Sequence, residues 1–181
     1  MKFRHAFAAM LSLLASSLAV APAQAQTATP TLEYVMTYKA ILEPPLAIDS
    51  SLLIVNVLPG GWIKGPNIRG TFLAPGADWL RVMPSGVLKL DVRAVMKTDD
   101  GDLLYVTYAG QLQHTEESFK KMNAGEVIKA SDVAYFYTAP TIQTGSKKYD
   151  YLNRVQLINK FVELQFGPNG SYIIYDVFAV K

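Results

Sequence analysis

From residue 32 onward, short runs of apolar and β-branched residues alternate with turns rich in glycine and proline. This spacing is typical of antiparallel β-strands joined by short connections. The Asp100-Gly101 pair lies between two such runs and predicts a tight hairpin, because glycine adopts positive φ without steric cost. We expect strands over Leu32–Ala40, Leu52–Leu58, Ile68–Leu73, Asp78–Met83, Val87–Thr98, Leu103–Tyr108, Val133–Thr138, Tyr149–Ile158, Phe161–Phe166 and Tyr172–Val180.

One segment follows a helical pattern instead. Residues 116–122 begin with two glutamates and end with two lysines and a methionine, the charge order that the helix dipole favours. Thr115 is placed to cap the N-terminus, and Gly125 stands just beyond the C-terminus as a stop signal. The sequence therefore predicts one short helix among many strands.

The longest predicted strand shows how its side chains are divided between two faces. Leu88, Leu90, Val92, Ala94 and Met96 share one face, and Lys89, Asp91, Arg93, Val95 and Lys97 share the other. The polar face has two interpretations: a solvated outer surface with an ordinary ion pair, or a row that lines a ligand-binding lumen. The fold class we expect is all-β and mainly antiparallel, a small closed or nearly closed β-barrel with one short helix; a β-sandwich is the alternative.

The N-terminus has the three parts of a secretory signal peptide. A basic start with Lys2 and Arg4 precedes an apolar run over residues 6–20 and the small-residue motif Ala23-Gln24-Ala25. The apolar run is shorter than the ~20 residues that span a bilayer. We expect cleavage after Ala25, a periplasmic or secreted product, and no membrane span once the signal is removed. The predicted organisation is a signal peptide (1–25), a flexible tail (26–31) and a single barrel domain (32–181).

The charge and the cysteine content exclude several kinds of partner and of chemical site. The chain has 17 basic and 15 acidic residues; without Lys2 and Arg4 the two numbers are equal at 15. A near-neutral domain lacks the basic surface that nucleic acids require, so we expect no nucleic-acid partner. The absence of cysteine excludes a thiol nucleophile, a thiolate zinc site and an iron–sulfur cluster. The oligomeric state stays open.

A series of short motifs resembles a known family. In chain order they are Leu42-Glu43-Pro44-Pro45, Gly60-Gly61, Gly65-Pro66, Arg69-Gly70-Thr71, Pro75-Gly76-Ala77-Asp78-Trp79, Asp91-Val92-Arg93, Thr98-Asp99-Asp100-Gly101 and Tyr149-Asp150-Tyr151-Leu152-Asn153. The pattern resembles the domain of unknown function 3237 family, also called uncharacterised protein family 0311, from about Leu32 to Val180. The resemblance implies a small β-barrel without an established activity. Tyr137 stands where the family has arginine, and Tyr151 where it usually has tryptophan.

The candidate site residues come mostly from these motifs. Asp78 and Asp91 are the candidate catalytic acids or bases, since a carboxylate in an apolar barrel would have a raised pKa. The candidate ligand-binding residues are guanidinium, aromatic and amide side chains: Arg69, Trp79, Arg93, Tyr105, Tyr137, Tyr149 and Asn153. Each also has a structural interpretation, as a turn residue, core residue or surface ion pair.

No cofactor or metal site is predicted. Asp99, Asp100 and Asp102 lack the ligand spacing of a calcium loop and lie where a hairpin turn is expected. His114 is the only histidine after the signal, too few for a histidine metal site, and we expect it to be exposed or capping the helix. The glycines at 60, 61 and 65 lack the Lys-Ser/Thr of a phosphate-binding loop.

Three functions remain open at this point. The leading hypothesis is that the barrel binds a small aromatic or apolar molecule in a partly polar cavity. The rival is a cofactor-free lyase, isomerase or hydratase with Asp78 or Asp91 as base and Arg69 or Arg93 stabilising an anion. The third is a protein-interaction module that uses an exposed strand edge. If Asp91 belongs to the site, Asp91→Asn alters ligand affinity or turnover with little loss of stability.

Overall fold

In the computed structural model, which describes residues 29–168 and 170–181, strands dominate. The strands are β1 (Leu32–Leu42), β2 (Leu46–Ala47), β3 (Leu52–Lys64), β4 (Arg69–Val82), β5 (Leu88–Thr98), β6 (Leu103–His114), β7 (Ile128–Lys129), β8 (Val133–Gln143), β9 (Leu157–Gly167) and β10 (Gly170–Val180). Helix α1 covers Glu116–Ala124, and a 3₁₀ helix, η1, covers Asp150–Arg154. The predicted signal peptide lies outside the described residues.

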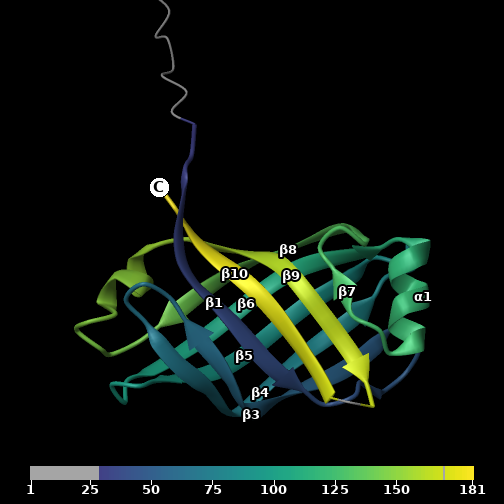
Figure 1. Cartoon of the computed structure of the whole chain (residues 1–181), viewed down its shortest axis with the longest axis horizontal. Coiled ribbons are helices and arrows are strands. Elements are labelled where there is room, and N and C mark those ends of the chain that lie inside the picture. The colour runs from purple at the N-terminus through teal and green to yellow at the C-terminus, as the bar shows by residue number, and fades with distance from the viewer. Residues whose placement is uncertain (1–28, 169) are drawn as a thin grey trace, which may run out of the picture.

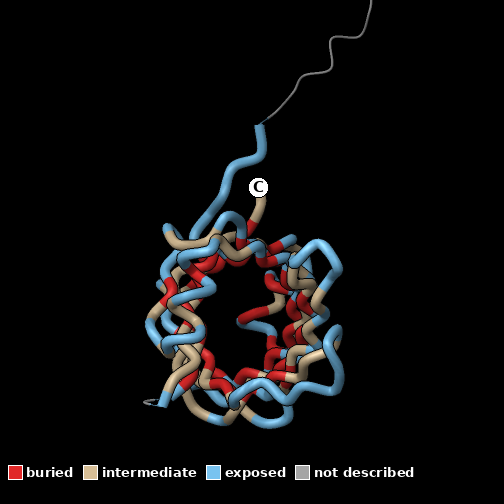
Figure 2. The backbone as a smooth tube through the Cα atoms, turned by 90° about the vertical axis from the view of Figure 1, so that its right-hand side faces the viewer, coloured by how far each residue is buried: buried red, intermediate tan, exposed pale blue. Residues whose placement is uncertain are grey.

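The long strands form a closed antiparallel barrel (Figure 1). Their order is β1-β10-β9-β8-β6-β5-β4-β3, and β3 pairs back with β1 to close the ring, while the two-residue strands β2 and β7 pair with β3 and β9. Figure 2 shows the backbone as a ring when the barrel is viewed nearly end-on. The prediction of an all-β, closed barrel with one short helix is therefore confirmed.

Several predicted strand ends are wrong, and the reason is barrel curvature. Pro59-Gly60-Gly61 and Pro75-Gly76 do not end strands; they lie within β3 and β4, where the pairing register shifts. Bulges of this kind let a long strand bend around a barrel without leaving the sheet. Residues 150–154, predicted as part of a strand, form η1 instead, and the strand starts at Leu157.

The division of β5 into two faces is confirmed. Leu90, Val92, Ala94 and Met96 are buried inside the barrel, whereas Asp91, Arg93 and Lys97 are exposed on its outer face. Helix α1 begins as predicted, since the Thr115 hydroxyl accepts a hydrogen bond from the backbone N–H of Ser118 at 3.0 Å. The helix ends at Gly125, which adopts a left-handed conformation with φ of 71°. It lies beside one end of the barrel (Figure 1).

At its two chain ends the domain is held by backbone pairing. Thr31, the last residue of the predicted tail, exchanges backbone hydrogen bonds with Lys181 at 3.1 and 2.9 Å. No helix in the described part of the chain has the length and apolar content of a membrane span.

Candidate functional site

The barrel interior is filled at one end and hollow at the other. The filled end is packed with side chains that have almost no exposure: Met36, Met96, Leu104, Leu157 and Val177. Towards the end beside α1, the interior contains a cavity of about 390 Å³. Inward-facing side chains from β1, β3, β4, β5, β6, β8, β9 and β10 all reach its wall. The closed sheet thus supplies both the core and the pocket.

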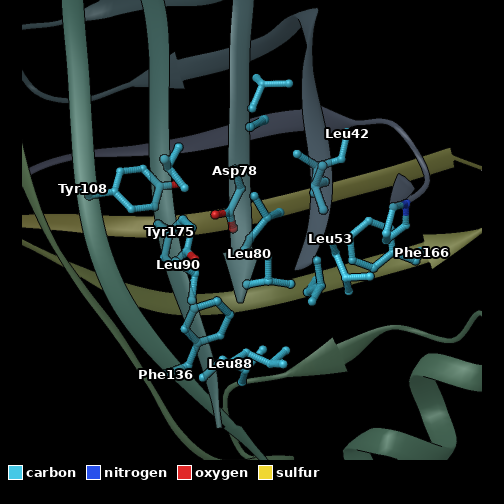
Figure 3. Close-up of a pocket in the computed structure, with 18 of the residues that line it drawn as sticks. Leu42, Leu53, Asp78, Leu80, Leu88, Leu90, Tyr108, Phe136, Phe166 and Tyr175 are labelled. Atoms are coloured by element: carbon cyan, nitrogen blue, oxygen red, sulfur yellow. The ribbon is translucent and has the colours of Figure 1, made fainter. Parts of the chain in front are cut away.

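The wall of the cavity is almost entirely apolar. Figure 3 labels part of this wall: Leu42, Leu53, Leu80, Leu88, Leu90, Phe136 and Phe166. Among the described residues that line it, Asp78 is the single aspartate, glutamate, lysine or arginine. An apolar pocket with a few convergent polar groups is the usual form of a small-molecule site.

Asp78 is held on β4 by one hydrogen bond. Its Oδ1 accepts from the backbone N–H of Asp91 on the neighbouring strand at 2.9 Å, whereas Oδ2 makes no hydrogen bond to any described residue. Burial raises the pKa of this carboxyl from its ordinary 3.8 to about 7; the Asp91 N–H opposes the shift and the Asp91 charge adds to it. Near neutral pH the carboxyl can therefore both accept and release a proton.

Three tyrosines surround the inner part of the cavity. Tyr108 on β6 lies in one row with Asp78, because Asp78 pairs with Val92 and Val92 pairs with Tyr108. Tyr38 on β1 pairs with Tyr175 on β10, and the two ring centroids are 5.6 Å apart. The ring of Tyr175 also lies 6.2 Å from that of Tyr108. Figure 3 shows the Asp78 carboxyl directed towards the side of the cavity on which Tyr108 and Tyr175 lie.

Not all polar atoms in this cluster are satisfied within the protein. Asn159 on β9 donates from Nδ2 to the Tyr38 hydroxyl at 2.8 Å. The Tyr175 hydroxyl and the Asn159 Oδ1 are buried without a hydrogen-bond partner among the described residues. Burial raises the pKa of Tyr38, Tyr108 and Tyr175 above the ordinary value of 10, so all three stay neutral hydroxyls.

One end of the cavity meets α1. Phe119 and Met122 of the helix line it together with His114, whose ring lies edge-on to Phe119 with centroids 5.6 Å apart. His114 Nδ1 is 2.9 Å from the Ser118 hydroxyl, and burial lowers its pKa. The expectation of an exposed or capping histidine is thus only half right: His114 contacts the first turn of α1 but also lines the cavity.

The structure does not bring the predicted site residues together, since only Asp78 lines the cavity. Trp79, Asp91 and Arg93 lie on the outer surface of the barrel. Arg93 Nη1 forms an ion pair with Asp91 Oδ1 at 3.1 Å, and the guanidinium lies 5.3 Å from the Trp79 ring centroid. The interpretation of the polar face of β5 as a lumen lining is therefore wrong.

Three other predicted residues lie at the barrel end opposite α1. The Tyr149 hydroxyl donates to Asp100 Oδ2 at 2.6 Å and so fastens the segment before η1 to the β5–β6 turn. The Asn153 side chain accepts from the Thr144 N–H at 2.9 Å and donates to the Thr144 carbonyl at 3.0 Å. Arg69 is exposed near the same turn.

Tyr105 and Tyr137 are exposed on the outer face of β6 and β8. The tyrosines that do line the cavity, Tyr38, Tyr108 and Tyr175, were missed. For Tyr108 a signal was present: it shares the inward row of β6 with Leu104, Val106 and Leu112. Tyr38 and Tyr175 also alternate with outward residues, but their meeting depends on the β1–β10 register.

This arrangement defines a small, closed antiparallel β-barrel with an apolar internal cavity that contains one carboxyl and a group of tyrosine hydroxyls. The chain belongs to the family described as protein of unknown function (DUF3237), whose model matches residues 30–180. The predicted family membership is confirmed.

Similar proteins include a UPF0311 protein and two solved structures whose names state no activity. A protein named UPF0311 protein from Rhodopseudomonas palustris strain TIE-1 is 34% identical over 129 residues, 68% of this chain and 84% of that protein. A crystal structure of a conserved protein of unknown function from Rhodopseudomonas palustris aligns with a TM-score of 0.75 and 26% identity, covering 86% of this chain and 99% of that one. A β-barrel-like protein from Acinetobacter baumannii AYE aligns with a TM-score of 0.69 and 26% identity over 87% of this chain and all of the other.

Proposed function

We propose that this barrel binds one small, largely apolar molecule in its internal cavity. The observation that carries the proposal is the unfilled end of the barrel: about 390 Å³ lined almost entirely by apolar side chains, next to an end that is closely filled. Pockets for small molecules have volumes of roughly 300–1,000 Å³ and this kind of lining. Protein interiors are otherwise closely packed, so a void of this size costs stability unless something occupies it.

The shape of the barrel also bears on the third hypothesis. A protein-interaction module needs an accessible strand edge or a large apolar surface. In the described residues β1 and β3 pair with each other, so the long strands close the ring. The internal cavity, by contrast, has no role in an interaction through the outer surface. The binding proposal accounts for the hollow end and the interaction module does not.

Filling the cavity tests the proposal directly. In Leu90→Trp, an inward leucine of β5 at the cavity wall becomes a larger indole that occupies the space. We expect the affinity for the uncharged fluorescent probe N-phenyl-1-naphthylamine to fall at least tenfold, about the loss of one well-buried contact. Fluorescence titration at pH 7.5 measures this affinity.

The matched control is Leu103→Trp, the same substitution at a leucine that is 56% exposed on β6. Its probe affinity should remain within twofold of the unchanged protein. Circular dichroism establishes that both variants are folded. A folded Leu90→Trp variant that binds the probe as well as the control does would place the bound probe outside the barrel and refute the proposal.

A second candidate function is proton transfer on a bound molecule, favoured by the pKa of about 7 at Asp78. A carboxyl with this pKa suits general acid–base catalysis at neutral pH. Neither Arg69 nor Arg93 lines the cavity, so the predicted guanidinium stabilisation of an anion has no place in it. The neutral hydroxyl of Tyr108, which lies in the same row as Asp78, would have to stabilise the anion instead. Chromatographic separation with mass-spectrometric detection of apolar hydroxy compounds incubated with the protein tests this: a new isomer or dehydrated product should form with the unchanged protein and not with Asp78→Asn.

We also propose that the chain is exported, which rests on the basic start, the apolar run and the Ala23-Gln24-Ala25 motif. Expression of the full chain in a Gram-negative host should release a protein that begins at Gln26 into the periplasm or the medium. Intact-mass analysis of each fraction measures this. Recovery of the uncleaved chain with residues 1–25 in the cytosol would contradict export, and substitution of Ala25 by a bulky residue should block the cleavage.

A further inference from the structure

We propose that the molecule bound in the cavity carries an uncharged hydroxyl group, an alcohol or a phenol, held between the Asp78 carboxyl and the Tyr108 hydroxyl. This inference rests on the proposed binding function and names the chemical class of its ligand. The apolar remainder of the molecule would extend from Asp78 towards α1, along the wall that includes Leu80, Leu88 and Phe166.

The placement of the two side chains follows from strand register. Asp78 and Tyr108 lie in one row across β4, β5 and β6, with Val92 between them. Strands two apart in a sheet are separated by roughly 10 Å, and inside a closed barrel the inward-pointing side chains of both strands converge on the axis. Figure 3 shows both side chains on the cavity wall, with the Asp78 carboxyl turned to the side on which Tyr108 lies. A small polar group of a ligand can therefore contact both.

Both side chains have hydrogen-bonding capacity that the protein leaves unused. Asp78 Oδ2 makes no hydrogen bond to a described residue. The Tyr108 hydroxyl lies close to the Tyr38 hydroxyl, which accepts from Asn159 Nδ2 and can therefore donate to Tyr108, leaving the Tyr108 proton for a ligand. The Tyr175 hydroxyl nearby is buried without a hydrogen-bond partner in the described part of the chain. Leaving polar groups of this kind unsatisfied in an apolar site is costly, so a bound oxygen that pairs with them gains affinity.

A hydroxyl fits this pair better than other oxygen groups do. It can donate to the ionised Asp78 carboxylate while it accepts from Tyr108, and it can accept from Asp78 when that carboxyl is protonated. A carbonyl is only an acceptor and matches the protonated form alone. Because the carboxyl titrates near neutral pH, the hydroxyl is the group that is satisfied in both states.

Charged ligands are disfavoured by the composition of the wall. Among the described lining residues there is no lysine or arginine to pair with a carboxylate or phosphate, and the Asp78 carboxylate repels an anion. An ammonium group could pair with Asp78 but would lose its hydration in a wall that is otherwise apolar. The cavity therefore selects an uncharged molecule.

Four ligands that share a naphthalene ring test the inference: naphthalene, 2-naphthalenemethanol, 2-naphthylmethylamine and 2-naphthoate. Calorimetric titration or displacement of N-phenyl-1-naphthylamine at pH 7.5 gives their affinities. We expect the alcohol to bind at least tenfold more tightly than naphthalene, the gain typical of a hydrogen bond to a charged group, and at least tenfold more tightly than the amine and the carboxylate.

The variant Tyr108→Phe should reduce the preference for the alcohol over naphthalene to less than threefold and leave naphthalene binding unchanged. The control is Tyr105→Phe, the same change at an exposed tyrosine of the same strand, which should keep the full preference. The comparison of the four ligands in the unchanged protein does not depend on either variant folding.

The outcomes separate this inference from the proposed function. Naphthalene binding as tightly as the alcohol would overturn the hydroxyl site while leaving the apolar pocket intact. Tighter binding of the amine or the carboxylate would overturn the uncharged class. Failure of all four ligands to bind would refute the proposed function itself.

Discussion

Replacing Asp78 with asparagine will raise the free energy of unfolding at pH 8 by up to about 4 kcal/mol and will leave it almost unchanged at pH 4. The gain corresponds to the rise in the pKa of Asp78 from 3.8 to about 7 on folding, at 1.36 kcal/mol for each pKa unit. Asparagine keeps the side-chain oxygen that accepts from the Asp91 N–H, so the native hydrogen bond is preserved. Urea unfolding of the variant and the unchanged protein between pH 4 and pH 8 measures the difference.

The sign follows from the protonation states of the folded and unfolded chain. Below about pH 4 the carboxyl is protonated in both, and it contributes nothing to the pH dependence. Between about pH 4 and pH 7 the unfolded chain releases its proton while the folded protein retains it, so stability falls as pH rises. Above pH 7 the folded protein carries the full cost of a buried carboxylate, which the uncharged asparagine avoids.

The control is Asp91→Asn, whose side chain is 56% exposed on the outer face and paired with Arg93. We expect a change of less than about 0.5 kcal/mol at every pH between 4 and 8, because exposed ion pairs contribute little and the Asp91 charge is only a minor cause of the raised Asp78 pKa. This replaces the expectation that Asp91→Asn would alter ligand binding. The tyrosines near Asp78, namely Tyr38, Tyr108 and Tyr175, stay neutral throughout this range. Equal pH profiles for Asp78→Asn and the unchanged protein would show that Asp78 titrates normally and is not buried as described.

The class of fold can be predicted from the sequence, because the alternation of inward-facing and outward-facing residues along a strand is a local property. On β5 the two faces can be read from the order of residues alone, and the same pattern places Asp78 in a row with Leu80 and Val82 that faces inward. Because the neighbouring Trp79 belongs to the opposite, outward row, the alternation alone could have shown that Asp78 and Trp79 lie on different faces of the sheet. Grouping residues by short motif ignored this alternation, and so Trp79 and Asp91 were assigned to the same site as Asp78.

What the sequence does not contain is the pairing between distant strands. Tyr38 and Tyr175 are 137 positions apart in the chain, and only the register of β1 and β10 places their rings 5.6 Å apart. The hollow end of the barrel likewise depends on how inward side chains from eight strands fill the ring. The proline–glycine segments within β3 and β4 were wrongly predicted to end strands for a related reason. Bulges and turns use the same residue types, and only the closure of the barrel shows that these segments form bulges.

The barrel closes at Gly61, and Gly61→Ala will reduce the free energy of unfolding by about 3–5 kcal/mol. Gly61 has φ of 67° within the bulge of β3 that faces β1, and a Cβ atom there would lie 2.1 Å from the Lys39 carbonyl oxygen. That oxygen belongs to the backbone of the partner strand, so the contact is relieved only if β1 and β3 move apart. Backbone strain of 1–3 kcal/mol and a steric penalty of similar size add to the expected loss. Urea unfolding measures it.

Gly60→Ala separates the steric cost from the backbone cost. Gly60 also has positive φ, 108°, but a Cβ atom there meets no atom of the described residues within 4 Å. We expect it to lose about 1–2 kcal/mol, less than Gly61→Ala, and to keep its affinity for N-phenyl-1-naphthylamine. Separation of β1 from β3 opens the ring that encloses the cavity, so Gly61→Ala should also bind the probe more weakly. Equal losses of stability in the two variants would mean that strain alone sets the cost, and that the β1–β3 contact does not hold the barrel closed.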